Sequence, residues 1–435
     1  MKLDLSLADF AKRRLRLASL GLPSSASLFD ADSPWFVAID QLEKAAAAAG
    51  RSLVSFGNYD YLSLGKDPRI IKAATDAAAQ LGVGAGASRL IGGERSLHRT
   101  LEDEIAGFIG SEAAIAIVSG YLMNLSLIPH LVTVGDLVVV DEFMHNSSLQ
   151  GAKASRATLR AFRHNDLDHL EEILQAQRDQ HAACLIVAEG IYSMDGDVVD
   201  LPRLLSLRDR YNAWVMIDEA HSIGVLGGTG RGICEHYDVD PNDVDLVMGT
   251  LSKTFVSMGG FVCARRSVIE FLKFTLPGFV FSVGLSPVIA AGAQTALAIL
   301  RQEPNRVRQL QELSRYFLDS AKAAGLNTGH AMGYGIIPIL FDDPAVTLAV
   351  SHALANESIY APPIMQVGLK SDESRIRFFI TAGHQRAQID RAIDIVTSAV
   401  RTAGAEPSSM DAGADYAGGA KLLPGMAVSP ASGGP

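Results

Sequence analysis

The hydrophobic positions in the middle of the chain form short runs that alternate with helix-like segments. The runs are too short for buried helices and several contain β-branched residues, so the pattern predicts strands. Strands that alternate with helices are typical of a parallel α/β sheet. The expected strands are Ala114–Val118, Leu137–Val140, Cys184–Ala188, Trp214–Ile217, Leu246–Met248 and Gly260–Cys263.

Polar residues and glycines follow these strands directly. The first five are followed or ended by Ser-Gly, Asp-Glu, Glu-Gly, Asp-Glu-Ala-His and Gly-Thr-Leu-Ser-Lys. Open α/β sheets bind their ligands at the carboxyl ends of the strands. The sequence therefore predicts a ligand site at that edge of the sheet.

The pattern divides the chain into four parts. We expect a helical N-terminal segment over residues 1–55, a large α/β domain over 56–290 and a smaller α+β domain over 291–404. The helices and strands expected around the smaller domain are Val288–Arg301, Asn305–Ala324, Gly335–Phe341, Arg375–Ile380 and Gln388–Arg401. Residues 405–435 are rich in Ala, Gly, Pro and Ser without periodicity, which is typical of a disordered tail.

Composition narrows the function by exclusion. The 435 residues are 48% hydrophobic and 20% charged, as in ordinary globular proteins, and 38 basic against 48 acidic side chains give a net charge of −10. This acidic balance argues against a nucleic-acid groove. The three cysteines are far apart and two lie in apolar runs, so we expect buried thiols in a reducing compartment and no metal site.

The N-terminal residues indicate a cytoplasmic protein. We expect no secretory signal, because Asp4, Asp9 and the basic residues 12–14 interrupt any apolar core there, and no apolar stretch is long enough to span a bilayer. The segment Leu7–Leu22 mixes leucines with basic residues and predicts a helix packed on its own domain. Peripheral membrane contact is the alternative interpretation.

Two strand-to-turn junctions carry the strongest chemical signal. One strand ends in Asp218-Glu-Ala-His221, and another leads through Gly-Thr-Leu-Ser to Lys253. A carboxylate at a strand end can pair with a protonated ring nitrogen, and a lysine whose pKa is depressed can form an imine. A lysine near a strand end is by itself usually solvated, but the two junctions together favour a cofactor site.

The acidic junction also matches the acidic box of certain helicases, whose carboxylates serve magnesium and water. That class needs the phosphate loop Gly-x-x-x-x-Gly-Lys-Ser/Thr upstream. Here the Lys253-Thr254 pair lies downstream and lacks the preceding glycine. Together with the acidic charge, this disfavours a helicase.

Several blocks in a fixed order resemble one enzyme family. From about residue 56 to 287, and more weakly to about 400, the chain resembles the α-oxoamine synthases, which are fold-type-I enzymes dependent on pyridoxal 5′-phosphate (PLP). The motifs are most similar to those of the serine palmitoyltransferases. In chain order, the matching blocks include Gly84-Ala-Gly-Ala-Ser-Arg89, Ser119-Gly-Tyr-Leu-Met-Asn124, Asp141-Glu-Phe-Met-His145, Glu189-Gly-Ile-Tyr-Ser193, Asp218-Glu-Ala-His221, Gly230-Arg-Gly232 and Gly249-Thr-Leu-Ser-Lys253.

The resemblance implies a fold-type-I architecture, with a large, mostly parallel sheet domain and a smaller C-terminal α+β lobe. It implies that Lys253 forms the imine with PLP and moves the substrate Cα proton, and that Asp218 pairs with the pyridine nitrogen. It assigns His221 to the ring phenolate oxygen and His145 to the ring face. Without its neighbours, His145 would be read as a capping or core histidine.

Further residues are implied to bind the phosphate and the substrates. The backbone N–H groups of Gly120 and Tyr121, at a helix start, would hold the phosphate together with the Thr250 hydroxyl. Arg377 resembles the family arginine that clamps the amino-acid carboxylate, although a solvated edge-strand arginine is the plainer interpretation. The remaining implied contacts are Ser193 at the cofactor ring, Ser282 at the phosphate, and Tyr61 and Ser88 at the substrate.

Two positions depart from the family pattern. Ala361 precedes Pro362-Pro363 where many relatives have an arginine, so the role of that arginine is altered or lost. Val283 stands where relatives often have Thr or Asn, in a segment that resembles the one lent across a homodimer to the neighbouring phosphate. Ser282 is the candidate replacement.

The reaction implied is a decarboxylative condensation of an amino acid with an acyl thioester, giving a 2-amino ketone, carbon dioxide and free thiol. We favour L-serine and a long-chain acyl-CoA, with 3-ketosphinganine as such a product. Alanine or glycine and an acyl-carrier-protein thioester remain open. An aminotransferase is disfavoured by His145, and a catalytically silent partner subunit by the presence of Lys253, Asp218 and His145.

Overall fold

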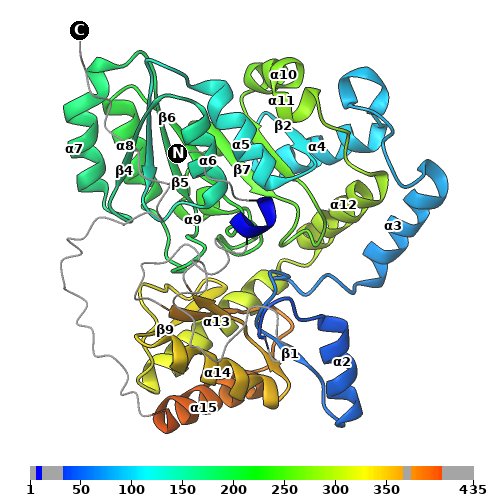
Figure 1. Ribbon diagram of the computed structural model, residues 1–435. Coiled ribbons are helices and arrows are strands. Elements are labelled where there is room, and N and C mark those ends of the chain that lie inside the picture. The colour runs from blue at the N-terminus through cyan, green and yellow to red at the C-terminus, as the bar shows by residue number, and fades with distance from the viewer. Residues whose placement is uncertain (1–5, 12–32, 366–373, 404–435) are drawn as a thin grey trace.

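The computed structural model describes residues 6–11, 33–365 and 374–403. The chain forms a larger lobe around a seven-stranded sheet and a smaller lobe around a three-stranded sheet, as Figure 1 shows. The expected tail at 405–435 and most of the helix expected at Leu7–Leu22 lie outside the described residues.

The large sheet has the strand order β2-β8-β7-β6-β5-β3-β4. β8 runs in the opposite direction to the other strands of this sheet, and all six strands expected from the sequence are confirmed with small shifts at their ends. The strands are β2 (Ala113–Ile117), β3 (Leu137–Asp141), β4 (Thr158–Phe162), β5 (Cys184–Glu189), β6 (Trp214–Asp218), β7 (Leu246–Thr250) and β8 (Gly260–Ala264).

The hydrophobic pattern does not indicate β4. This strand lies at the edge of the sheet, and Phe162 is its single buried residue. Because Arg160 and its neighbours face solvent, the strand lacks the apolar run that marks the central strands.

Both faces of the large sheet are buried, and side chains alternate between them. On β3, Val138 and Val140 enter one hydrophobic core, whereas Leu137 and Val139 enter the other. One core contains side chains of α5 (Gly120–Leu131), α6 (Asn146–Ala154), α10 (Arg266–Thr275) and α11 (Pro277–Val280). The other contains those of α4 (Ser96–Ile109), α7 (Leu167–Gln177), α8 (Leu201–Arg210), α9 (Ile233–Tyr237) and α12 (Pro287–Gln302). Burial on both faces explains the nearly continuous apolar strands.

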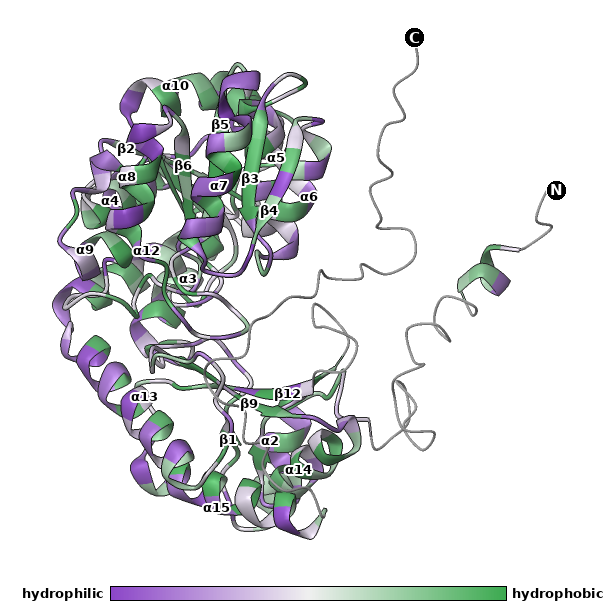
Figure 2. Cartoon of the chain, turned by 90° about the vertical axis from the view of Figure 1, so that its left-hand side faces the viewer, coloured by the Kyte–Doolittle hydropathy of each residue, from purple (hydrophilic) through white to green (hydrophobic). Residues whose placement is uncertain are grey.

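The smaller lobe is an antiparallel sheet with helices packed on it. Its strands are β11 (Pro363–Met365), β12 (Ser374–Phe379) and β9 (Ile336–Phe341), and its helices are α13 (Asn305–Ala323), α14 (Pro344–Asn356) and α15 (Arg386–Thr402). Figure 2 shows hydrophilic positions along the outer side of α13 and hydrophobic ones toward the lobe. One hydrophobic core runs through this lobe and the large one, because β9, β12 and α13 side chains join the core of α4 and α12.

Residues before the large sheet connect the two lobes. Strand β1 (Val54–Ser55) pairs in parallel with β10 (Ile359–Tyr360), and the Trp35 indole donates to the Pro363 carbonyl at 3.1 Å. This N-terminal part also contains α2 (Ile39–Ala48) and α3 (Pro68–Leu81), of which α3 packs on α12. The end of the N-terminal segment is therefore joined to the smaller lobe by strand pairing.

Local capping sets the helix ends. Helix α3 begins where the Asp67 side chain accepts from the Arg69 N–H at 2.9 Å, with Pro68 in its first turn. Helix α4 ends at Gly110, which has a φ of 95° that glycine adopts readily. Short helical turns also occur: a π-helix at Arg89–Gly93 and 3₁₀ turns at Arg178–Gln180 and Pro241–Asp243.

The cysteines and the helix lengths bear on two predictions from the sequence. Cys184, Cys234 and Cys263 are all buried and free, as expected. No helix in the described ranges has both the length and the apolar character to cross a bilayer.

Candidate functional site

The carboxyl ends of three adjacent strands supply the centre of the site. Glu189 ends β5, Asp218 ends β6 and is its register partner, and Thr250 ends β7. Lys253 follows β7 by three residues, so the strand order that the fold sets brings this amine beside the carboxylates. The ligand edge expected from the sequence is where these side chains meet.

Asp218 is buried and held by two donors. Its Oδ2 accepts from Asn124 Nδ2 at 2.8 Å, and its Oδ1 accepts from the Ala220 N–H at 3.0 Å. Asn124 lies on α5, whereas Asp218 ends β6, so the packing of helix on sheet fixes the carboxylate. The Asn124 Oδ1 atom is buried and has no partner among the described residues.

His145 is linked to Asp218 through a short chain of hydrogen bonds. Its Nδ1 lies 2.7 Å from the Ser147 hydroxyl, which accepts from Asn124 Nδ2 at 3.0 Å. His145 also caps α6, because its Nδ1 accepts from the Ser147 N–H at 3.3 Å. The capping interpretation is thus correct geometrically, and the capping fixes the orientation of the imidazole. Burial lowers the pKa of His145, and the charge of Asp218 opposes this.

Lys253 sits in a tight turn after β7. Val256 N–H donates to the Lys253 carbonyl at 2.9 Å, and Val256 has a φ of +43°, which a β-branched residue rarely adopts. Burial lowers the pKa of Lys253 to about 8, against the charges of Asp218 and Glu189 that raise it. A much larger share of this amine is therefore neutral near pH 7 than for a solvated lysine.

His221 is held as a buried, neutral imidazole. Its Nδ1 lies 2.7 Å from the Tyr61 hydroxyl, and its ring stacks on Phe379 of β12 with centroids 6.4 Å apart. Burial first, and the positive charges of Lys253 and Arg377 next, hold the pKa of His221 well below its usual value. Tyr61 is fully buried, so it reaches the site through His221.

A close approach of helix to strand forms the predicted phosphate position. A Cβ at Gly120, the first residue of α5, would lie 3.0 Å from Thr250 Oγ1, which is tighter than most such contacts, so glycine suits the close approach of the helix start to the strand end. The Ser119 side chain caps the helix by accepting from Leu122 N–H at 3.3 Å. The first N–H groups of α5 and the Thr250 hydroxyl therefore lie together, an arrangement that suits an anion.

Arg377 joins the smaller lobe to the site. Its guanidinium donates to the Ser193 carbonyl and lies over the Phe379 ring at 4.6 Å, and burial lowers its pKa. The neighbouring Arg375 behaves differently: it is buried and pairs with Asp195 at 2.9 Å. The solvated interpretation of Arg377 is therefore wrong, because its strand packs against the large lobe.

Ser88 and Ser282 are placed elsewhere in this chain. Ser88 precedes the π-helix Arg89–Gly93, and Ser282 follows α11. The two segments are adjacent, because the Gly284 N–H donates to the Ala87 carbonyl at 3.0 Å. Within the described ranges, no hydrogen bond joins either serine to Lys253, Asp218 or His221, so their roles stay predictions.

Sequence reasoning assigned no role to three residues that line the site. Glu189 accepts from the His145 N–H at 2.6 Å and the Ser193 N–H at 3.1 Å, and burial raises its pKa to about 8. Asn124 holds Asp218, and the Tyr59 ring centroid lies 5.9 Å from Lys253 Nζ. Asn124 and Glu189 both stand at the ends of the blocks quoted above, which is the signal that could have identified them.

Comparisons with known proteins show the family of this chain. The family model for class I and II aminotransferases matches residues 51–396. A serine palmitoyltransferase of Bacteroides ovatus is 34% identical over 81% of this chain and 89% of its own. An 8-amino-7-oxononanoate synthase of Methylorubrum extorquens is 40% identical over 80% of this chain and 86% of its own. The chain belongs to the α-oxoamine synthases.

Solved structures show the same fold. A structure of SPT with PLP superposes with a TM-score of 0.78 at 29% identity, covering 82% of this chain and 89% of that chain. The serine palmitoyltransferase of Sphingomonas wittichii gives a TM-score of 0.78 at 28% identity, covering 86% and 99%. This α-oxoamine synthase is thus a PLP-dependent fold-type-I enzyme, and the predicted fold class and cofactor are confirmed.

The residues of this α-oxoamine synthase suit PLP chemically. An aldehyde needs a lysine amine that loses its proton more readily than a solvated lysine, a pyridinium nitrogen needs a buried carboxylate, and a phosphate suits a helix start. Lys253, Asp218 and Gly120 with Thr250 provide these in one place. The Asn124 Oδ1 atom, which has no hydrogen-bond partner among the described residues, can also accept a hydrogen bond beside Asp218.

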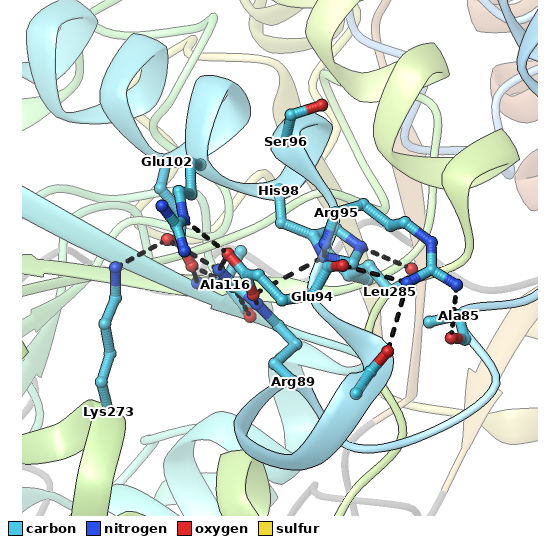
Figure 3. Close-up of polar contacts among 12 residues, drawn as sticks. Ala85, Arg89, Glu94, Arg95, Ser96, His98, Glu102, Ala116, Lys273 and Leu285 are labelled. Carbon is cyan, nitrogen blue, oxygen red and sulfur yellow. Dashed lines mark hydrogen bonds and ion pairs between the residues drawn. The ribbon is translucent and has the colours of Figure 1, made fainter. Parts of the chain in front are cut away.

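A second buried ionic cluster lies apart from these groups (Figure 3). Arg89 donates to both Glu94 and Glu102, and Lys273 of α10 pairs with Glu102 at 2.9 Å. Glu102 also accepts from the Ala116 N–H of β2 at 2.8 Å. The Arg89 cluster (Arg89, Glu94, Glu102 and Lys273) therefore connects the segment 89–94 to strand β2 and to helix α10.

Proposed function

We propose that this α-oxoamine synthase condenses L-serine with a long-chain acyl thioester. Carbon dioxide and free thiol leave, and the product is a 2-amino ketone such as 3-ketosphinganine. The observation that carries the proposal is the low-pKa amine of Lys253 beside Asp218, with Arg377 on the facing lobe. Serine is favoured by the motif blocks and by the likeness to serine palmitoyltransferases.

Each residue has a defined task in the proposed reaction. PLP, when bound, supplies an electron-withdrawing ring that stabilises negative charge at the amino-acid Cα. Lys253 as a neutral amine takes the Cα proton and returns one later. Asp218 would face the ring nitrogen, with its two oxygens held by Asn124 and the Ala220 N–H. His145, whose imidazole is fixed by Ser147, would cover the face of the ring.

Binding and orientation come from the remaining groups. Arg377 offers a planar pair of donors to the amino-acid carboxylate. His221 presents a neutral imidazole whose orientation is set by Tyr61. The N–H groups of Gly120 and Tyr121 and the Thr250 hydroxyl would hold the phosphate.

The exposed apolar side chains of the 274–285 segment fit either a long apolar acyl group or the partner chain of a homodimer. Within residues 274–285, Leu276, Phe279 and Leu285 are buried in the core. Core packing does not account for Phe274 and Phe281, which are 72% and 86% exposed, nor for Val283 at 53%. We further propose a homodimer in which Ser282 of one chain approaches the phosphate of the other, as members of the family act as dimers.

A second candidate keeps the reaction and changes the amino acid. The 40% identity to an 8-amino-7-oxononanoate synthase favours alanine as the amine donor, with an acyl-carrier-protein thioester. The product named there carries a terminal carboxylate on its chain. The motif blocks and the likeness to serine palmitoyltransferases favour serine and an uncharged acyl chain instead.

One experiment separates the candidates. L-serine, L-alanine and glycine are titrated into PLP-loaded protein while the cofactor absorbance is recorded, and thiol release is then measured with palmitoyl-CoA and hexanoyl-CoA. We expect the tightest binding with serine and thiol release that needs serine and palmitoyl-CoA together. Preference for alanine would contradict the serine assignment, and formation of a 2-oxo acid without carbon dioxide would identify an aminotransferase.

A further inference from the structure

His164 lies between two carboxylates outside the groups described so far. Its Nδ1 lies 2.9 Å from Asp141 Oδ1, at the end of β3, and its Nε2 lies 3.1 Å from an oxygen of Asp197. A neutral imidazole has one N–H donor, so it can donate to one of these carboxylates only. Both contacts are satisfied together when both ring nitrogens carry protons.

The surroundings support an imidazolium. The ring stacks on Phe143 with centroids 4.6 Å apart and meets the edge of Tyr192 at 4.5 Å. Its own backbone N–H donates to Glu142 at 3.0 Å. Burial alone would lower the pKa of His164, but the hydrogen bonds and charges of Asp141 and Asp197 outweigh it and raise the pKa to about 11.

The two carboxylates are otherwise occupied by N–H donors. Asp141 accepts from the Phe143 N–H at 2.8 Å and from the Asn165 N–H at 2.8 Å, and Asp197 accepts from Asn165 Nδ2 at 2.7 Å. In the described part of the chain, no group of His, Cys, Asp and Glu has the arrangement of a metal site. Among the described residues, the His164 imidazolium is the cation that lies between these two carboxylates.

Asp197 belongs to a closed loop that carries Ser193. The Tyr192 N–H donates to the Asp197 carbonyl at 3.0 Å, and the Gly196 N–H donates back to the Tyr192 carbonyl at 2.9 Å. Any shift of Asp197 is therefore passed to Ser193. The Ser193 carbonyl is the group that accepts from Arg377.

The same loop contacts the smaller lobe on its other side. Arg375 donates to the Met194 carbonyl at 3.1 Å and pairs with Asp195 at 2.9 Å. Gly196 has a φ of +72°, and a Cβ there would lie 2.2 Å from the Ile336 carbonyl oxygen of β9. The loop thus contacts the smaller lobe through Arg375, and His164 links its Asp197 to Asp141 of the large sheet.

We propose that His164 is a positioning residue for the amino-acid carboxylate: as an imidazolium between Asp141 and Asp197 it fixes the 192–197 loop, whose Ser193 carbonyl orients Arg377. The proposal rests on the carboxylate role proposed for Arg377. It predicts that disturbing His164 weakens amino-acid binding through Arg377, while the PLP contacts of Lys253 and Thr250 stay intact.

The test compares His164→Gln with His169→Gln, a nearby histidine that touches neither carboxylate of the pair. Serine affinity is measured from the cofactor absorbance of loaded protein, and PLP affinity from reconstitution of the apoprotein. For His164→Gln we expect serine Kd to rise about tenfold, or about 1.4 kcal/mol, with PLP Kd within about threefold of the parent. KM for serine should rise with kcat nearly unchanged. His169→Gln should match the parent.

A double-mutant cycle tests whether the effect passes through Arg377. In the Arg377→Lys background, His164→Gln should change serine Kd by less than about twofold, because the two residues act as a unit. Asp197→Asn provides a second variant of nearly equal size, expected to give the same selective loss should His164→Gln fold poorly. The His164 ring signal in NMR spectra, assigned by its loss in His164→Gln, should remain at the protonated position up to about pH 9.

The outcomes distinguish this inference from the proposed function. If Arg377→Lys leaves serine binding unchanged, the carboxylate role of Arg377 is wrong. If Arg377→Lys weakens serine binding but His164→Gln and Asp197→Asn do not, the positioning role is wrong. Equal losses of PLP and serine binding, additive effects in the double mutant, or a ring that titrates near pH 6.5 would also overturn it.

Discussion

The Arg89 cluster and the groups around Lys253 both contain a buried basic side chain, but the pKa of that side chain is shifted in opposite directions. Arg89 donates to two carboxylates, and although burial opposes it, these bonds hold the pKa of Arg89 above its usual value. Lys253 has no ion-pair partner among the described residues, and burial lowers its pKa to about 8. A paired cation is locked in one protonation state, whereas an unpaired buried amine can lose its proton and react.

The two regions also differ in what they connect. The Arg89 cluster joins α4, β2 and α10 within the large lobe. The Lys253 region is completed by Arg377 and Phe379 of β12, which belongs to the smaller lobe. Removing a charge should therefore damage stability in the first region and chemistry in the second.

The largest effect should come from Lys253→Ala. Without the amine, turnover should fall by at least about 10³-fold, since it serves both as the attachment point and as the proton carrier. The absorbance band of the imine between Lys253 and PLP should be lost, while the free energy of unfolding of the apoprotein changes by less than about 1 kcal/mol. Turnover assays, spectra and urea denaturation check this. Retained turnover would overturn the whole assignment of the site.

Arg89→Met should mainly reduce stability. It leaves Glu102 buried with Lys273 as its remaining cation, so the free energy of unfolding should fall by about 3–5 kcal/mol, measured by urea denaturation. The matched control is Arg99→Ala, which removes an exposed partner of Glu94 and should cost less than about 1 kcal/mol. Similar losses in both variants would show that burial does not decide the contribution.

The pH dependence of cofactor loading should report the Lys253 pKa. The neutral amine is the nucleophile, so the rate at which apoprotein takes up PLP should rise about tenfold per pH unit below about pH 8 and level off above it. An ordinary lysine would continue to rise toward pH 10.5. Stopped-flow absorbance measures the rate, with a blocked lysine amide as the reference, and a profile like that of the reference would contradict the lowered pKa.

Thr250→Val should give the smallest effect and sharpen the phosphate assignment. Losing one hydroxyl to a charged phosphate should weaken PLP binding about tenfold, or about 1.5 kcal/mol. Binding of pyridoxal, which lacks the phosphate, should be nearly unchanged. Equal losses for both ligands would place the Thr250 effect elsewhere in the site.

Much of the fold follows from local patterns in the sequence. The strands that these patterns do not indicate are missed for physical reasons. Central strands such as β3 and β5 are buried on both faces, so their apolar runs are visible in the sequence. The edge strand β4 lacks such a run because most of its residues face solvent. The pair β1–β10 lacks one because each strand has two residues and pairs with a segment that is distant in the chain. Their existence depends on pairing between segments that are far apart in the chain.

The sequence by itself determined the strand ends that carry Asp218 and the turn that carries Lys253, because local apolar runs and glycines specify them. Only the tertiary structure decided that Asn124 holds Asp218, that Tyr61 acts through His221, and that Glu189 joins His145 to Ser193. It also decided the pKa of Lys253, since burial arises when distant segments pack together. Local sequence sets where a side chain leaves the backbone, and the packed neighbours set its charge and partners.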